Sequence, residues 1–302
     1  MKSYDRVVAA ERMSLWRRFH QRRWFVRWPA KGFVLAATVF FVCFPYPWLF
    51  VRHVRRWQDP NSVVEPDAPQ LAPWVDEVQA QNKPGTQPPQ VLRQVESFVY
   101  DHVPYAYDWE TWGVADYLPT VAEVFEKGQE DCDGRAVIAA SMLRKLGFRA
   151  DLVTDFAHVW VRTDQGDTMS PGRPPAVVAQ ERGFKINYRA VTDLIPAAAY
   201  GLSPFPLLRE AIILCVLWLL LLAPGVGRAV PLASLAGLWI GLEFMRFGGE
   251  QWKHPVSWMQ WVGTLTILLS VGLLLVRGLR TRAARRPFAA GAAPVSPPAA
   301  AS

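Results

Sequence analysis

The chain has 302 residues, of which 51% are hydrophobic and 20% charged, and its formal net charge is +7. This length accommodates one domain of ordinary size with further segments beside it. Positions 57–206 carry 12 Lys and Arg against 21 Asp and Glu, a net charge of −9, so the positive excess lies entirely in the flanks. Each basic cluster adjoins an apolar segment. Membrane orientation explains such clusters better than nucleic-acid binding, so we expect no nucleic-acid partner.

Four windows of the sequence are almost free of charge and are predicted to span a lipid bilayer: 32–51, 207–226, 229–247 and 257–276. A bilayer core about 30 Å thick needs roughly 20 apolar helical residues. The middle two windows form one long apolar stretch that is broken at Pro224 and Gly225. Two alternatives to membrane spans are considered. Either of the short middle windows could be a buried core helix, and the first window could be a cleaved signal peptide. A retained anchor is favoured there, because the first window lacks a short apolar core ending in a small-residue cleavage site.

Basic residues predict the orientation of these spans. Segment 1–31 holds nine Lys and Arg, and the tail beyond position 276 holds five Arg. Because cytoplasmic flanks are enriched in Lys and Arg, both termini are expected to be cytoplasmic, and the region between the first two spans extracytoplasmic (periplasmic). The chain is then a multi-pass protein of the cell (inner) membrane. Arg52, Arg55 and Arg56 disagree with this rule, since they lie just outside the first span.

The remaining sequence divides into a linker, a domain and a tail. Segment 52–89 is rich in Pro, Gln, Asp and Ala and is predicted to be a linker with at most one short helix, at 74–81. A domain is predicted over 90–200. The tail at 277–302 is basic and then Ala/Pro-rich, and it is expected to be disordered.

Helices come first in the predicted domain, and strands follow. Apolar residues over 91–103 follow one helical face, and Thr120 with Glu123 forms a capping box for a short helix. A further helix is predicted from Cys132 to the stop signal Gly147. Strands are predicted at 149–154, 158–163, 167–169 and 185–190. Helices followed by antiparallel strands indicate an α+β domain.

Cys132 is the one cysteine outside the predicted spans. It falls in the first turn of its helix, where unpaired backbone N–H groups favour an anion such as the thiolate, the nucleophilic form of cysteine. Neighbouring carboxylates oppose that charge, and a nearby histidine such as His158 would offset them. From these two residues alone, an inert buried cysteine and a surface histidine are the favoured interpretation, because they define no spacing rule.

The wider sequence around Cys132 changes that interpretation. A segment with several aromatic residues, at 112–120 and 123–125, is followed by a glycine turn from Gly128 to Cys132. The Cys132 helix comes next and ends at Leu146-Gly147, and a later strand opens with His158-Val159-Trp160. Over about 90–171 this order resembles the transglutaminase-like and related bacterial cysteine-protease domains. The resemblance implies a papain-like α+β fold in which Cys132 is the nucleophile and His158 the general base.

Two positions depart from the family pattern. The family's third catalytic residue is usually an aspartate one short strand after the histidine, often followed by proline, and Ser170 occupies that position here. Because a serine carries no charge to stabilise an imidazolium, Asp167 is taken as the candidate third member, with Asp164 and Asp155 as alternatives if the hairpin register differs. Glu130 stands where the family usually has glycine, and it adds a carboxylate beside the thiol.

The expected function is that of a membrane-anchored thiol enzyme that acts on peptide or amide bonds through a covalent intermediate. The resemblance favours hydrolysis over cross-linking, with a protein or peptide as substrate and no cofactor. One alternative is a catalytically degenerate domain that binds peptides at the membrane, which Ser170 motivates. Another is a transporter with a soluble insert, which has the least support because one acidic residue lies well inside the spans.

Other candidate residues point to chemistry less directly. His102 is interpreted as a surface histidine at a helix end. A metal site built from Cys132, His158 and Asp133 is not expected, because no second Cys or His lies at ligand spacing.

Overall fold

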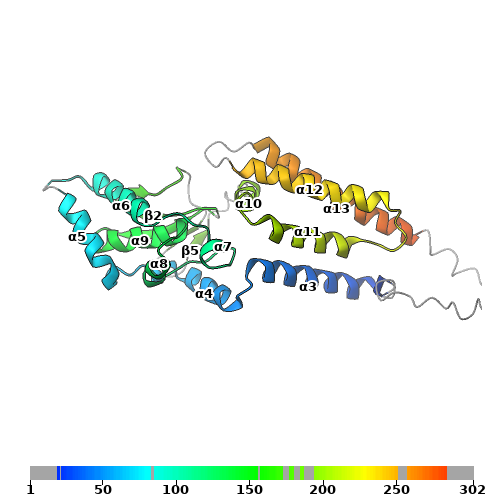
Figure 1. The fold of residues 1–302 in the computed structure, drawn as a ribbon, viewed down its shortest axis with the longest axis horizontal. Coiled ribbons are helices and arrows are strands. Elements are labelled where there is room, and N and C mark those ends of the chain that lie inside the picture. Colours follow the sequence, from blue (N-terminus) through cyan, green and yellow to red (C-terminus); the bar gives the residue numbers. More distant parts are fainter. Residues whose placement is uncertain are drawn as a thin grey trace, which may run out of the picture. The chain divides into compact units, whose positions relative to one another are not determined.

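The structure is a computed structural model that describes residues 19–20, 22–82, 85–155, 157–172, 177–179, 184–186, 194–250 and 257–283 (Figure 1). Two compact units make up the chain. The first, which we call the domain unit, consists of Phe40–Arg209 and Arg246–Gln260. The second, which we call the helical unit, consists of Met1–Val39, Glu210–Met245 and Trp261–Ser302.

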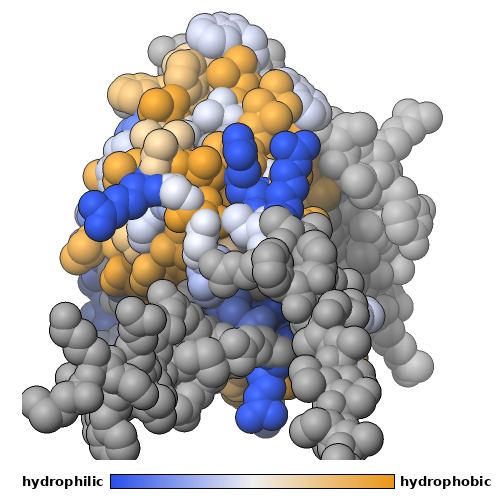
Figure 2. All heavy atoms as spheres, turned by 90° about the vertical axis from the view of Figure 1, so that its right-hand side faces the viewer, coloured by the Kyte–Doolittle hydropathy of each residue, from blue (hydrophilic) through white to orange (hydrophobic). Residues whose placement is uncertain are grey.

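Apolar helices build the helical unit. Three helical stretches in the described part of the chain are long and apolar enough to cross a membrane: Trp24–Cys43 in α3, Ala229–Gly249 in α12 (Ala229–Glu250) and Trp258–Thr281 in α13 (Ser257–Ala283). A fourth crossing is added if α10 (Leu194–Leu202) and α11 (Leu207–Leu221), bent by 119°, form one span. The chain therefore carries helices suited to a bilayer. Hydrophobic side chains make up much of the coloured surface in Figure 2, with a few strongly hydrophilic groups among them.

Helices α12 and α13 lie side by side (Figure 1). The Ser234 hydroxyl donates to the Ser270 carbonyl across this pair at 3.0 Å. A Cβ on Gly241 would come within 2.9 Å of the Gly263 carbonyl. Small residues thus allow a close backbone approach, as is common between membrane helices.

The first apolar helix is displaced from its predicted position. It was expected over 32–51, but α3 covers Trp24–Cys43 and a separate helix, α4 (Pro47–Gln58), follows. Pro45 and Pro47 explain the break, because proline lacks the backbone N–H that a continuous helix needs and clashes with the preceding turn. Eight residues of the predicted basic segment 1–31 therefore belong to α3.

The domain unit contains helices and one antiparallel sheet in the strand order β3-β2-β1-β4-β5. The strands are β1 (Ala150–Thr154), β2 (Val159–Thr163), β3 (Gly166–Thr168), β4 (Val177–Ala179) and β5 (Phe184–Ile186). Val153 pairs with Trp160, and Arg162 with Asp167. The α+β class is thereby supported. The predicted strand at 185–190 is partly matched by β5, and its last four positions lie outside the described residues.

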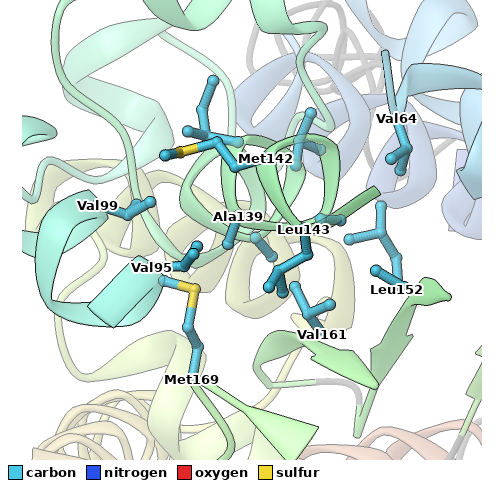
Figure 3. Packing of buried hydrophobic residues seen from close by; sticks show 14 of the residues in the cluster. Val64, Val95, Val99, Ala139, Met142, Leu143, Leu152, Val161 and Met169 are labelled. Carbon is cyan, nitrogen blue, oxygen red and sulfur yellow. The ribbon is translucent and has the colours of Figure 1, made fainter. Parts of the chain in front are cut away.

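Helix α9 (Cys132–Lys145) forms the centre of this unit. Its positions 136–143 are all buried, and all of them except Ser141 are apolar, as expected for a helix segment inside a core. It packs on β1 and β2 and against α6 (Pro88–His102). Figure 3 shows Ala139, Met142 and Leu143 of this helix surrounded by side chains from α6 and from the sheet. This packing fixes the position of the first turn of α9, which carries Cys132.

The predicted short helix at Thr120 is confirmed as α8 (Val121–Lys127). The Thr120 hydroxyl accepts from the Glu123 N–H at 3.3 Å, and the Glu123 carboxylate accepts from the Thr120 N–H at 2.8 Å. Gly128 ends the helix in the left-handed conformation, with φ of 68°. These contacts are the two halves of the predicted capping box.

The structure differs from the prediction that 52–89 is a linker. After α4 come two short 3-10 helices, Pro60–Val63 and Pro69–Leu71, and then α5 (Ala72–Gln81). Their apolar side chains are buried in the core of the domain unit: Val63, Leu71, Val75 and Val78. The segment is thus part of the domain. Its sparse apolar residues, separated by Pro, Gln and Asp, concealed this role.

Candidate active site

Cys132 is the first residue of α9. The Asp131 carboxylate caps this helix by accepting from the Asp133 N–H at 3.0 Å. Before the cap, the Glu130 N–H donates to the Pro104 carbonyl at 3.0 Å, and the Ala106 N–H donates to the Glu130 carbonyl at 3.3 Å. The thiol is therefore held at a helix N-terminus whose incoming chain is fixed by backbone hydrogen bonds.

The thiol lies in a cavity of about 200 Å³ lined by Tyr100, Tyr105, Cys132, Arg135, His158, Val159 and Met169. The structure thus brings Cys132 and His158 together, although 26 positions separate them in the sequence. The backbone of Val159, the residue after His158, lies close enough to the Cys132 sulfur to lower the pKa of the thiol. The start of β2 therefore touches the start of α9 at this point.

The environment of Cys132 favours the neutral thiol. Burial raises its pKa well above the usual value, and the carboxyl groups of Asp131 and Asp133 raise it further. The thiol donates to the Asp133 carboxylate, with 3.3 Å between Sγ and Oδ1. A neutral thiol is a weak nucleophile. An attack by Cys132 at neutral pH therefore requires a neighbouring base to take its proton.

His158 is oriented by backbone and side-chain contacts. Its Nε2 lies 3.0 Å from the Met169 carbonyl oxygen. Because a carbonyl oxygen only accepts, Nε2 must carry the hydrogen, which leaves Nδ1 as the nitrogen that can take up a proton in the neutral ring. The Asp155 carboxylate accepts from the backbone N–H of Ala157 and of His158 at 3.1 and 3.0 Å, and it holds the turn before β2.

Asp167, the candidate third member, has other partners. Its carboxylate accepts from Arg162 Nε and Nη2 at 3.0 Å each and from Trp160 Nε1 at 2.9 Å. The Ser170 hydroxyl accepts from the Gly172 N–H at 3.2 Å. The position at His158 Nε2 is taken instead by the backbone carbonyl of Met169. The two alternative aspartates also have other positions. Asp155 caps the turn before β2, and Asp164 lies in the exposed turn after β2.

Met169 has a positive φ of 58°, unusual for a residue with a side chain. This conformation costs roughly 1–2 kcal/mol for an L-residue, and such strained positions cluster at functional sites. Here it accompanies a carbonyl aimed at the histidine ring, while the Met169 side chain is buried in the core (Figure 3). We take the strained residue to be the element that fixes the His158 tautomer.

A group of carboxyls, most of them buried, lies close to the thiol. The carboxyl oxygens of Asp108, Glu130 and Asp131 lie within 4.8 Å of one another, and so do the ligand atoms of Asp131, Cys132 and Asp133. Burial, followed by the charge of Asp131, raises the pKa of Glu130 to about 8. Burial also raises the pKa of Asp131 to about 7. At neutral pH this group therefore retains protons, which limits the negative charge beside Cys132.

The oxygens of these carboxyl groups are also possible ligands for a cation. His158, which the sequence placed in a conceivable metal set with Cys132 and Asp133, belongs to neither group. Glu130 is tied to Trp112, whose Nε1 donates to its carboxylate at 2.5 Å. The Tyr117 N–H donates to Asp108 at 2.6 Å. These donors satisfy one oxygen of each carboxyl, whereas Asp108 Oδ1 is buried and accepts no hydrogen bond from the described residues.

Sequence reasoning missed several residues of the cavity. Tyr100 comes from the end of α6, Tyr105 from the segment after it, and Met169 contributes a backbone carbonyl. Arg135 could have been predicted from the sequence, because a residue three positions after Cys132 in a helix lies on the same face as Cys132. The tyrosines gave no comparable signal, since they depend on how α6 packs.

Comparison with known protein families, curated proteins and solved structures gives no match for this chain. The chemistry of the site is therefore argued from its own geometry. That geometry consists of a half-buried thiol at a helix start, an imidazole of defined tautomer and a shared cavity.

Proposed function

We propose that the chain is a membrane-anchored, transglutaminase-like thiol enzyme that acts on peptide or amide bonds. Cys132 is the nucleophile and His158 the general base. The observation that carries this proposal is the shared cavity, in which the first residue of α9 meets the residue that precedes β2. A Cys–His pair brought together in this way is the recurring form of an activated thiol.

The reaction follows from the assigned tautomer. His158 Nδ1 takes the thiol proton as the sulfur attacks the substrate carbonyl, and a C–S bond forms. The oxyanion is assigned to backbone N–H groups at the start of α9. His158 then returns the proton to the leaving amine, the C–N bond breaks and a thioester remains. Water, deprotonated by the same histidine, hydrolyses the thioester to an acid and regenerates the thiol. Hydrolysis is preferred to cross-linking by resemblance.

The membrane setting of the proposal rests on the apolar helices and on their basic flanks. With four crossings, both termini are cytoplasmic and the domain unit is extracytoplasmic, because Lys and Arg concentrate on the cytoplasmic side. A peptide or protein outside the membrane is then the substrate.

A degenerate binding module is the second candidate function. The observation that favours it concerns Asp167. Its carboxylate accepts hydrogen bonds from Arg162 and Trp160 and not from His158 Nε2, which contacts the Met169 carbonyl. A carbonyl at His158 Nε2 stabilises an imidazolium less than a carboxylate does. In this alternative the same cavity holds a peptide without cleaving it.

Acylation by p-nitrophenyl acetate separates the two functions. We expect the full chain in detergent, with Cys43→Ser and Cys215→Ser, to acquire one acetyl group on Cys132 and to release p-nitrophenolate. His158→Ala should slow this acylation by about 100-fold, the usual size of a general-base contribution, and Cys132→Ala should abolish it. The matched control is His102→Ala, which removes an exposed histidine outside the cavity. Equal acylation rates in the two histidine variants would leave the binding module as the better account.

A further inference from the structure

Arg135 brings a positive charge into the cavity beside the thiol. It lies three positions after Cys132 in α9, on the same helical face, and both residues line the cavity. The other lining residues are two tyrosines, a histidine, a valine and a methionine. The guanidinium is therefore the permanently charged group among them.

The guanidinium is held in one orientation. Its Nε and Nη2 donate to the Val103 carbonyl at 3.0 and 2.7 Å. Its central carbon lies 5.1 Å from the Tyr100 ring centroid and 5.0 Å from that of Tyr105, within the range of cation–π attraction. These contacts use the Nε–Nη2 edge of the group. In the described part of the chain, no residue accepts a hydrogen bond from Nη1.

The charge persists at neutral pH. Burial lowers the pKa of Arg135, while the tyrosines and Asp131 raise it, and an arginine remains protonated at neutral pH because the guanidinium is the most basic side-chain group. Asp131, the carboxyl that acts on the pKa of Arg135, has a pKa raised to about 7, so it neutralises the arginine only in part. A rigid cation with an unused edge therefore faces a small, partly apolar cavity.

We propose that Arg135 binds a carboxylate of the substrate, so that the enzyme acts on peptides or amides with a free carboxylate close to the reacting carbonyl. A planar carboxylate fits the Nη1–Nη2 edge, since guanidinium and carboxylate pair through parallel N–H···O bonds. Nη2 carries two hydrogens, and the one on the Nη1 side takes no part in the bond to Val103. One helical turn separates this edge from Cys132. The inference rests on the proposed function, because it names the substrate class of the same site.

Two alkylating reagents of similar size test the inference without a known substrate. Iodoacetate is an anion and iodoacetamide is neutral. With either reagent a bond forms between the Cys132 sulfur and carbon, iodide leaves, and the thiol proton passes to His158. We expect Arg135→Gln to lower the ratio of the iodoacetate rate to the iodoacetamide rate by about tenfold, as expected for the loss of one charge close by in a screened site. The protein is the full chain with Cys43→Ser and Cys215→Ser.

Two further variants keep this result decisive. Arg93→Gln removes an exposed arginine outside the cavity, and its rate ratio should equal that of the unmodified site. Arg135→Lys keeps the charge, and we expect it to keep most of the preference for iodoacetate even if the bonds to Val103 weaken. An unchanged ratio in Arg135→Gln would overturn the inference. Iodoacetamide alone reports the thiol, so an unreactive Cys132 would instead count against the proposed function.

Competition assigns the source of the carboxylate. N-acetylglycine carries an α-carboxylate, and the α-amide of N-acetylglutamate carries a side-chain carboxylate. The ligand that slows iodoacetamide labelling in the unmodified site but not in Arg135→Gln identifies which carboxylate is bound. Equal protection by the neutral analogue N-acetylglycinamide would contradict recognition through charge.

Discussion

At the scale of single residues, the most consequential feature is the carbonyl that His158 contacts. The Met169 oxygen accepts from Nε2 at 3.0 Å, in the position where a carboxylate would stabilise the charged ring. A neutral acceptor still fixes the tautomer. The carbonyl therefore orients the histidine, and it supports a charged ring less than a carboxylate at the same position would.

Gly134 shows how closely the residues behind the thiol are packed. A Cβ at this position would lie 2.4 Å from Glu130 Cγ and 2.8 Å from its Cβ and Cδ. Glu130 is fully buried and held by Trp112, so it has little freedom to move aside. The absence of a side chain at Gly134 therefore leaves room for the Glu130 side chain.

Gly134→Ala is predicted to destabilise the domain unit by about 1–3 kcal/mol, the usual cost of overpacking a core. The melting midpoint of the full chain in detergent, followed by tryptophan fluorescence, should fall by several degrees. Gly201→Ala is the control, because a Cβ there meets nothing within 4 Å. Equal melting midpoints for the two variants would show that the Glu130 side chain can move aside to accommodate the added Cβ.

At the scale of elements, local signals predicted the helices around the site well. The capping residue Thr120, the stop at Gly147 and the apolar face over 91–103 each marked a helix that the structure contains. The alternating pattern likewise marked β1 and β2. Cys132 could therefore be placed at a helix start, and His158 at the head of a strand, from the sequence.

Elements with weak local patterns were missed or misassigned. Strand β4 has three residues, too few to show an alternation. The segment 52–89 buries its apolar side chains through tertiary packing, which spacing does not reveal. The third position of the site depends on a left-handed residue, Met169, and on a hairpin register that places Asp167 opposite Arg162. These outcomes are set by packing and pairing between distant residues.

At the scale of the whole molecule, the structure accounts for two arginines that broke the positive-inside rule. Arg56 donates to the Glu123 carboxylate at 2.6 and 3.1 Å, and Arg52 lies 3.8 Å from the same group. Arg56 also donates to the Tyr117 hydroxyl and the Leu118 carbonyl, at 2.8 Å each. These arginines join α4 to α8 within the domain unit. Their positive charge is therefore explained by folding, and it need not report the cytoplasmic side.

Impermeant labelling tests the proposed orientation. In right-side-out vesicles, a membrane-impermeant maleimide should label Asp76→Cys, an exposed position of α5. Ser3→Cys and Ser302→Cys should react only after detergent is added, because the basic flanks hold both termini inside. Each variant carries Cys43→Ser, Cys132→Ser and Cys215→Ser, so that the introduced cysteine is the sole thiol. Labelling of Ser302→Cys in sealed vesicles would contradict four crossings and favour three.

The pH dependence of Cys132 alkylation tests the central claim most directly. Burial and the neighbouring carboxyls hold the thiol pKa well above its usual value, so a thiol without a base should react with iodoacetamide only in alkaline solution. If His158 takes the proton, the unmodified site should react at pH 7, and His158→Ala should lose that reaction while keeping the alkaline one. Superimposable pH profiles for the two proteins would contradict the assignment of His158 as the base.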